Sequence, residues 1–68
     1  MREHFYTIIL YNKKTKEEII SFEMGKKINP AISLFEDLSR VVKASQALLV
    51  LYEDYKTEYE TEIRTNKK

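Results

Sequence analysis

Residues 31 to 65 contain no glycine, proline or asparagine, and this absence constrains the fold more than any other feature of the sequence. Chain reversals ordinarily use these residues, because they tolerate backbone conformations that other residues avoid. A long segment without them favours one continuous element over several short ones joined by turns.

The spacing of large side chains in this segment favours a helix. Nine positions recur at alternating intervals of four and three, which places them on one helical face, and seven of them are large apolar or aromatic residues. The positions are Leu34, Leu38, Val41, Ser45, Leu48, Tyr52, Tyr55, Tyr59 and Glu62. In a strand, the apolar run from Ala47 to Leu51 would place apolar residues on both faces, so it would not separate an apolar face from a polar one. We therefore predict a single amphipathic helix from about residue 30 to 63.

An alternative interpretation makes the same region a second hairpin. From Tyr55 to Ile63, tyrosine, threonine and isoleucine alternate with charged residues, as they do in a half-buried strand. On this alternative the helix ends near Ser45, and residues 47–53 and 55–64 form two strands. The fold would then be ββαββ, with a four-stranded antiparallel sheet.

The N-terminal third predicts an antiparallel β-hairpin over residues 4–24. Residues 4–12 are rich in aromatic and β-branched types, residues 12–16 are polar, and residues 18–24 resume the strand pattern. No Asn-Gly or Asp-Gly pair is present, so we expect a bulged turn of three to five residues.

The start of the helix follows a connector over residues 25–29. Asn29 is a favoured N-cap and Pro30 suits the first helical position, where no backbone donor is needed. Ser33 with Glu36 offers an alternative capping box one turn later. The fold prediction is thus an α+β protein of one small domain, in the order ββα, with a frayed tail over residues 64–68.

A chain of 68 residues without cysteine has few means of stabilising a small core. Disulfides are excluded, which leaves self-association as the expected remedy. The helix is too long for one hairpin to cover, so we predict a homodimer. Its interface would use the helical seam formed by Leu48, Tyr52, Tyr55 and Tyr59.

Two charged surfaces are candidate binding sites for another macromolecule. The acidic one lies near Glu53, Asp54 and Glu60, where carboxylates are dense, and would meet a protein partner. The basic one comprises lysines of the hairpin turn and of the connector, which could contact nucleic-acid phosphates. These lysines are Lys13, Lys14, Lys16, Lys26 and Lys27.

Catalytic and metal chemistry is not expected. His4 is the one histidine, with Glu3 as its only acidic neighbour in sequence, so we interpret it as an ordinary residue at a strand end. The chain contains no phosphate-binding loop, catalytic triad pattern or HExxH motif. We expect no enzyme activity, no cofactor and no metal.

The resulting prediction is a small, non-enzymatic regulatory protein that binds another protein as a homodimer. Inhibitors encoded by phages or mobile elements have this size and character. The alternative is a nucleic-acid-binding regulator that uses the lysines named above. The longest aliphatic run, from Ala47 to Leu51, is too short for a membrane span, and no apolar signal region follows the first residues. We therefore expect a cytoplasmic protein with no membrane partner.

Overall fold

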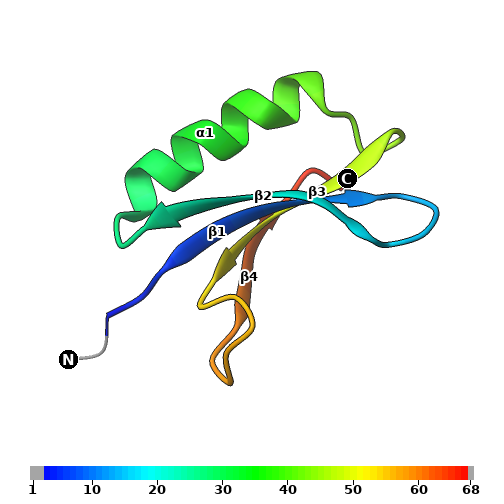
Figure 1. The fold of residues 1–68 in the computed structure, drawn as a ribbon. Helices are drawn as coiled ribbons and strands as arrows, with labels where there is room; N and C mark the ends of the chain where they lie inside the picture. The colour runs from blue at the N-terminus through cyan, green and yellow to red at the C-terminus, as the bar shows by residue number, and fades with distance from the viewer. Residues whose placement is uncertain (1–2, 68) are drawn as a thin grey trace.

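The computed structural model describes residues 3–67, in which one helix packs on one face of a four-stranded antiparallel sheet (Figure 1). The strand order is β2-β1-β3-β4, so the first and third strands form the centre of the sheet. The elements, in chain order, are β1 (Tyr6–Asn12), β2 (Glu18–Gly25), α1 (Ile28–Val41), β3 (Ala47–Glu53) and β4 (Thr61–Thr65).

The hairpin expected over residues 4–24 is present as β1 and β2. Ile9 pairs with Ser21, and residues 13–17 form the turn. The side chain of Asn12 organises this turn, because its Oδ1 atom accepts hydrogen bonds from the backbone N–H of Lys14 at 2.9 Å and of Thr15 at 3.1 Å. The turn is irregular, as predicted from the missing Asn-Gly pair.

The prediction of one helix from residue 30 to 63 is wrong, because α1 ends at Val41 and two strands follow. The ββαββ alternative fits the structure. The central strand β3 explains the error: Leu49, Val50 and Leu51 are 1%, 2% and 0% exposed although they alternate between the two faces. A strand that is buried on both faces has no reason to alternate apolar and polar residues.

Turns form in this half of the chain without glycine or proline. In the β3–β4 loop, Asp54 and Lys56 adopt left-handed backbone conformations, with φ of 56° and 63°. Aspartate is one of the few non-glycine residues that enter this region readily. Between α1 and β3, the carbonyl of Lys43 accepts hydrogen bonds from the N–H of Gln46 at 2.9 Å and of Ala47 at 3.1 Å. Backbone hydrogen bonds thus close both reversals.

The helix begins two residues earlier than predicted. Lys27, not Asn29, is the N-cap residue, and it makes no side-chain capping hydrogen bond. Pro30 lies within the first turn, where its missing donor costs nothing because the first N–H groups of a helix have no intrahelical partner. Ser33 and Glu36 lie inside the helix, so the capping box considered for them is absent.

The main core lies between α1 and the central strands. Phe35 and Ala31 of the helix are 4% and 0% exposed, and they pack with side chains of β1 and β3. The strand residues in this cluster are Tyr6, Ile8, Leu49 and Leu51. Every second residue of each central strand therefore faces the helix, as strand geometry requires.

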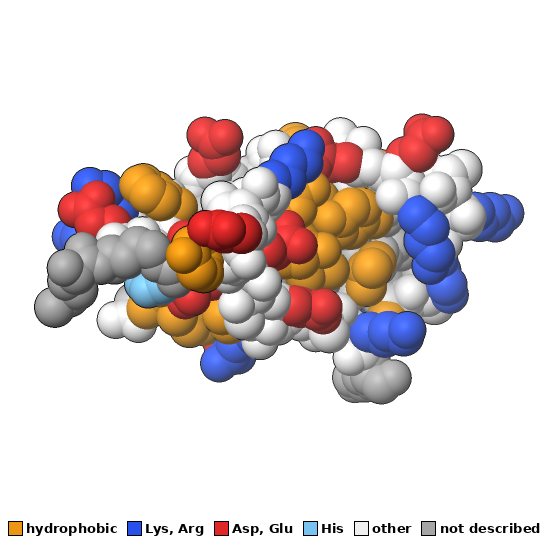
Figure 2. Space-filling model, turned by 90° about the horizontal axis from the view of Figure 1, so that it is seen from below, with side chains coloured by type: hydrophobic (Ala, Val, Ile, Leu, Met, Phe, Trp, Pro, Cys, Tyr) orange, Lys and Arg blue, Asp and Glu red, His pale blue; other side chains and the backbone are white. Residues whose placement is uncertain are grey.

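The opposite side of the sheet, here called the open face, carries the intervening residues of the central strands. On it Ile9 and Val50 pair across β1 and β3 and are 0% and 2% exposed, although α1 lies on the other side. Neighbouring side chains of the open face must cover them. Figure 2 shows this face, with hydrophobic side chains gathered in its middle and basic ones toward one end.

Candidate functional site

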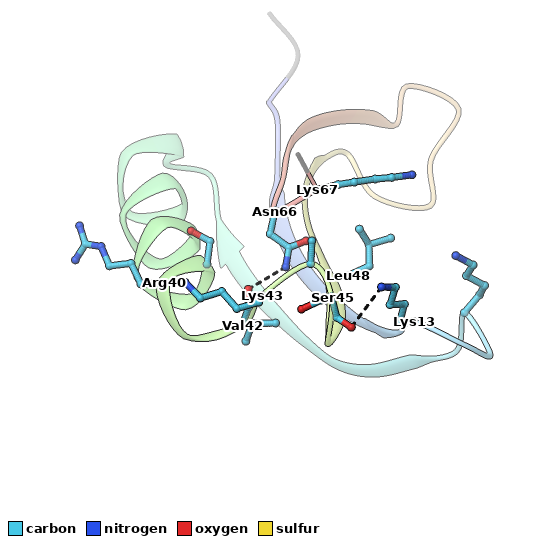
Figure 3. A pocket seen from close by; sticks show the side chains of 11 residues that line it. Lys13, Arg40, Val42, Lys43, Ser45, Leu48, Asn66 and Lys67 are labelled. Carbon is cyan, nitrogen blue, oxygen red and sulfur yellow. Dashed lines mark hydrogen bonds between the residues drawn. The ribbon is translucent and has the colours of Figure 1, made fainter.

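A groove of about 830 Å³ lies at one end of the sheet, where four segments meet (Figure 3). The segments are the β1–β2 turn, the last turn of α1, the α1–β3 connector and the residues that follow β4. Its size is within the range of ligand sites in proteins. Residues that are far apart in sequence line it, so the site exists only in the folded chain.

The β1–β2 turn is joined to the connector across the groove. The Nζ atom of Lys13 donates a hydrogen bond to the carbonyl oxygen of Ser45 at 3.3 Å (Figure 3). Lys16, at the other end of the turn, adopts a left-handed conformation with φ of 66°, and its N–H donates to the carbonyl of Asn12 at 2.8 Å. The turn thus holds two lysines at the rim of the groove.

Asn66 fixes the opposite wall. Its Nδ2 atom donates to the carbonyl oxygens of Val42 at 3.0 Å and Ala47 at 3.1 Å, and its Oδ1 atom accepts from the N–H of Leu49 at 3.0 Å. Its own N–H donates to the carbonyl of Leu49 at 3.0 Å. One asparagine therefore ties the connector and β3 to the end of β4.

The prediction of a frayed tail over residues 64–68 is wrong for Arg64 and Thr65, because both belong to β4. Lys68 lies outside the described residues.

The charged residues that line the groove are basic. Among residues 3–67 the lining contains five basic side chains and no acidic one. The basic ones are Lys13, Lys16, Arg40, Lys43 and Lys67. Arg40 makes an ion pair with Asp37 at 3.3 Å, but both side chains are exposed, so water weakens this attraction. The concentration of one sign of charge in a concave surface attracts anions.

Part of the lining is apolar. Val42, Ala44 and Leu48, here called the apolar floor, are less exposed than the basic side chains around them. Leu48 lies one residue before Leu49, which packs against the helix, so its side chain is on the open face and the groove reaches that face. A ligand with an anionic part and an apolar or aromatic part would match both kinds of lining.

The structure divides the five lysines predicted to bind nucleic acid. Lys13 and Lys16 line the groove, and Lys14 lies in the same turn. Lys26 and Lys27 lie at the other end of the hairpin, where Lys26 pairs with Glu3 at 2.8 Å. Sequence reasoning missed the remaining groove cations, which are Arg40, Lys43 and Lys67. A continuous helix over residues 30–63 would keep Arg40 and Lys43 away from the hairpin turn, and Lys67 falls in the tail that was predicted to fray.

The tyrosines predicted to form a helical seam are partly brought together, but by strands. Tyr52 and Tyr55 have ring centroids 4.8 Å apart, and the Tyr11 hydroxyl lies 3.1 Å from that of Tyr52 and 3.4 Å from that of Tyr55. We call these three residues the tyrosine cluster. Burial raises the pKa of Tyr11, and its hydrogen bonds with the other two hydroxyls raise it further. Leu48 lies in β3 and Tyr59 is exposed in the β3–β4 loop, so no helical seam exists.

The residues predicted to form one acidic surface do not share one exposed surface. Asp54 is 6% exposed, whereas Glu60 lies in the exposed part of the loop and accepts a hydrogen bond from the N–H of Lys56 at 2.8 Å. His4, interpreted from the sequence as an ordinary strand-end residue, also has acidic neighbours in space. Its Nδ1 atom lies 2.9 Å from Oδ2 of Asp54 and 3.4 Å from Oε1 of Glu53.

Comparison of the chain with protein-family models, with curated protein sequences and with solved structures gives no match. Within residues 3–67, no helix is both long enough and apolar enough to cross a membrane. The chemistry of the groove is therefore the basis for assigning a function.

Proposed function

We propose that this protein is a small, non-enzymatic binding protein whose groove receives the phosphate backbone of a nucleic acid. The observation that carries the proposal is that, within the described part of the chain, five basic side chains and no carboxylate line the groove together with apolar residues. Phosphate contacts from lysine and arginine supply most of the affinity in non-specific nucleic-acid binding. This proposal modifies the nucleic-acid alternative drawn from the sequence, because it keeps Lys13 and Lys16 and replaces Lys14, Lys26 and Lys27 with Arg40, Lys43 and Lys67.

The form of the groove favours a polymer over a small anion. Most of its cations are the ends of long, exposed side chains, and they come from separate segments around an open surface. Such an arrangement follows a chain of phosphates, whereas small-molecule sites enclose most of the ligand. The apolar floor near Leu48 can accept a base or sugar, which favours single-stranded nucleic acid.

Salt-dependent binding of fluorescently labelled oligonucleotides tests the proposal. Anisotropy titrations with single-stranded and duplex DNA and RNA at several salt concentrations give the slope of log K against log salt. If all five cations contact phosphates, the slope for single strands should be about −3.5. A protein that binds no nucleic acid at low salt would contradict the proposal.

Matched lysine variants locate the binding surface. Lys43→Gln should weaken binding and reduce the slope by about 0.7, since one phosphate contact is lost. Lys27→Gln is the control, because Lys27 is exposed but lies away from the groove. Equal losses in the two variants would show that the groove is not the site.

A second candidate function is binding to protein, with a second copy of the chain as the partner. The observation that favours it is the open face, which shows hydrophobic side chains in its middle (Figure 2) and includes the partly exposed Leu48 and tyrosine cluster. Tyrosine is enriched in protein interfaces, because its ring buries area while its hydroxyl stays hydrogen-bonded. The homodimer and the inhibitory role predicted from the sequence would then rest on this face.

Sedimentation equilibrium at micromolar concentrations distinguishes the two candidates. A dimer that uses the open face should give twice the monomer mass, and Leu48→Glu should return it to the monomer. Glu58→Gln, on the exposed β3–β4 loop, is the control and should leave the mass unchanged. A monomer at all concentrations would contradict self-association and would not affect the nucleic-acid proposal.

A further inference from the structure

We infer that His4, Glu53 and Asp54 form a binding site for a divalent transition-metal ion that takes imidazole and carboxylate ligands together, such as zinc. The site lies at the start of β1 and the end of β3, where Tyr6 pairs with Glu53, and it is separate from the basic groove. His4 and Asp54 are separated by 50 positions in the sequence, so only the folded sheet brings these side chains together.

The distances from His4 to the two carboxylates are close to those between ligands of one metal ion. His4 Nδ1 lies 2.9 Å from Asp54 Oδ2 and 3.4 Å from Glu53 Oε1, and the three ligand atoms all lie within 4.8 Å of one another. Ligand atoms around tetrahedral zinc are about 3.3–3.6 Å apart, given Zn–N and Zn–O bonds of about 2.0–2.2 Å. The histidine is therefore within about half an ångström of the required separation from each carboxylate.

Each carboxylate is oriented by a contact of its other oxygen. Asp54 Oδ1 accepts a hydrogen bond from the N–H of Phe5 at 3.3 Å, while Oδ2 is directed toward His4. Glu53 Oε2 accepts from the Tyr6 hydroxyl at 3.4 Å, while Oε1 is directed toward His4. Hydrogen bonds of this kind hold ligands in place around metal ions.

Burial adds rigidity to the same set. The side chain of Asp54 is 7% exposed, that of Glu53 is 23% exposed and that of His4 is 36% exposed. The backbone of Asp54 is also fixed, because its N–H donates to the carbonyl of Phe5 at 2.8 Å. One ligand is thus buried and two reach the surface, so an ion can enter from solvent.

The donor set selects the class of ion. Imidazole nitrogen suits zinc, copper, iron and nickel, whereas magnesium and calcium prefer oxygen ligands only. One histidine and two carboxylates give three protein ligands, which leaves a fourth position for water or for an anionic ligand. A bound ion would fasten the segment before β1 to the end of β3, and would stabilise a domain that has no disulfide.

Zinc titration of the full-length protein without an affinity tag tests the inference, because a histidine tag would itself bind zinc. After treatment with EDTA and its removal, isothermal titration with zinc chloride should give one ion per chain. Zinc at ten times its Kd should raise the midpoint of thermal unfolding by about 5 °C or more. Magnesium chloride at the same concentration should leave the midpoint unchanged.

Two ligand variants and one control decide the outcome. His4→Gln removes a half-exposed ligand and should abolish the zinc-induced shift while the far-UV spectrum stays native. Asp54→Asn should also reduce it, and asparagine tolerates the left-handed backbone at this position. Glu23→Gln, an exposed carboxylate outside the cluster, should respond like the wild type. No shift in the wild type, or an equal shift in His4→Gln, would overturn the inference, the latter by showing adventitious zinc binding.

Discussion

At the scale of single residues, Asn66 makes the largest contribution to the geometry of the groove. Its side chain makes three hydrogen bonds to the backbone of the connector and of β3. Each of those backbone groups would lose a partner if the side chain were removed. A buried polar group left without a partner costs about 1–3 kcal/mol.

We therefore expect Asn66→Ala to lower the free energy of unfolding by about 1–3 kcal/mol, measured by urea denaturation. Asn29→Ala is the matched control, because Asn29 is exposed in the first turn of α1. Its effect should stay within about 0.5 kcal/mol. Equal effects of the two substitutions would show that Asn66 does not hold the connector.

The buried tyrosines predict how stability depends on pH. Burial raises the pKa of Tyr6 and of Tyr11, with Glu53 adding to the effect at Tyr6 and neighbouring hydroxyls at Tyr11. A folded-state pKa above the unfolded value of about 10 means that the folded chain holds its proton more tightly. The resulting stability is complete below pH 10 and is lost as the pH rises further.

The free energy of unfolding, measured by urea denaturation between pH 7 and pH 11, should therefore stay level at first and should fall above pH 10. The free energy should fall by up to about 1.4 kcal/mol per pH unit for each tyrosine that remains protonated in the folded chain. Tyr11→Phe keeps the ring and removes the hydroxyl, so the fall should be less steep in this variant. A fall of unchanged steepness would contradict the role given to Tyr11.

At the scale of elements, the β1–β2 turn contains a strained lysine. Lys16 has φ of 66°, a conformation that costs a residue with a Cβ atom about 1 kcal/mol. Lys16→Gly should therefore raise the free energy of unfolding by up to about 1 kcal/mol. Lys14→Gly should lower it by about 0.5 kcal/mol, since φ at Lys14 is not positive and glycine only adds freedom to the unfolded chain. Chemical denaturation of both variants measures the difference.

The elements of the N-terminal half were predicted correctly, whereas in the C-terminal half the preferred long helix is wrong and the ββαββ alternative fits. The hairpin was predicted correctly because residues 4–12 and 18–24 have strong strand preferences on both sides of a polar turn. The alternative assigned residues 47–53 to a strand, but the helix was preferred because a strand that is buried on both faces has the same composition as the apolar side of a helix. The turn at Asp54, formed without glycine, gave no sequence signal for the reversal.

Only those parts of the candidate sites whose residues are close together in the sequence could be predicted. Lys13 and Lys16 are close in sequence, and their turn was recognised as a basic surface. Lys43 reaches the same groove only because the chain reverses after α1, which the prediction of a continuous helix excluded. His4 and Asp54 meet across the central strand pair, and no local pattern relates residues so far apart.

At the scale of the whole molecule, the free energy of unfolding is expected to be small. A chain of 68 residues is expected to unfold with a free energy of about 3–10 kcal/mol. Phe35 is the largest helix residue in the core and is 4% exposed. Phe35→Ala should cost about 3–5 kcal/mol, which is enough to unfold much of the population.

Thermal denaturation followed by circular dichroism measures this effect. The wild type should show a single cooperative transition. In Phe35→Ala the midpoint should be lower by about 10 °C or more, because a loss of a few kcal/mol shifts the midpoint of a small domain by this amount. Val41→Ala is the control, because Val41 is 72% exposed at the end of the helix. A small shift in Phe35→Ala would mean that α1 does not close the core.

The position of β1 in the middle of the sheet has a consequence for synthesis of the chain. β1 is made first, yet one of its edges pairs with β3, which begins at Ala47. Until the ribosome has released residues 47–53, that edge of the early hairpin has exposed backbone donors and acceptors, and it can pair with any other extended chain. Nascent copies emerging close together on one messenger RNA are consequently most vulnerable to mispairing during the interval in which α1 emerges.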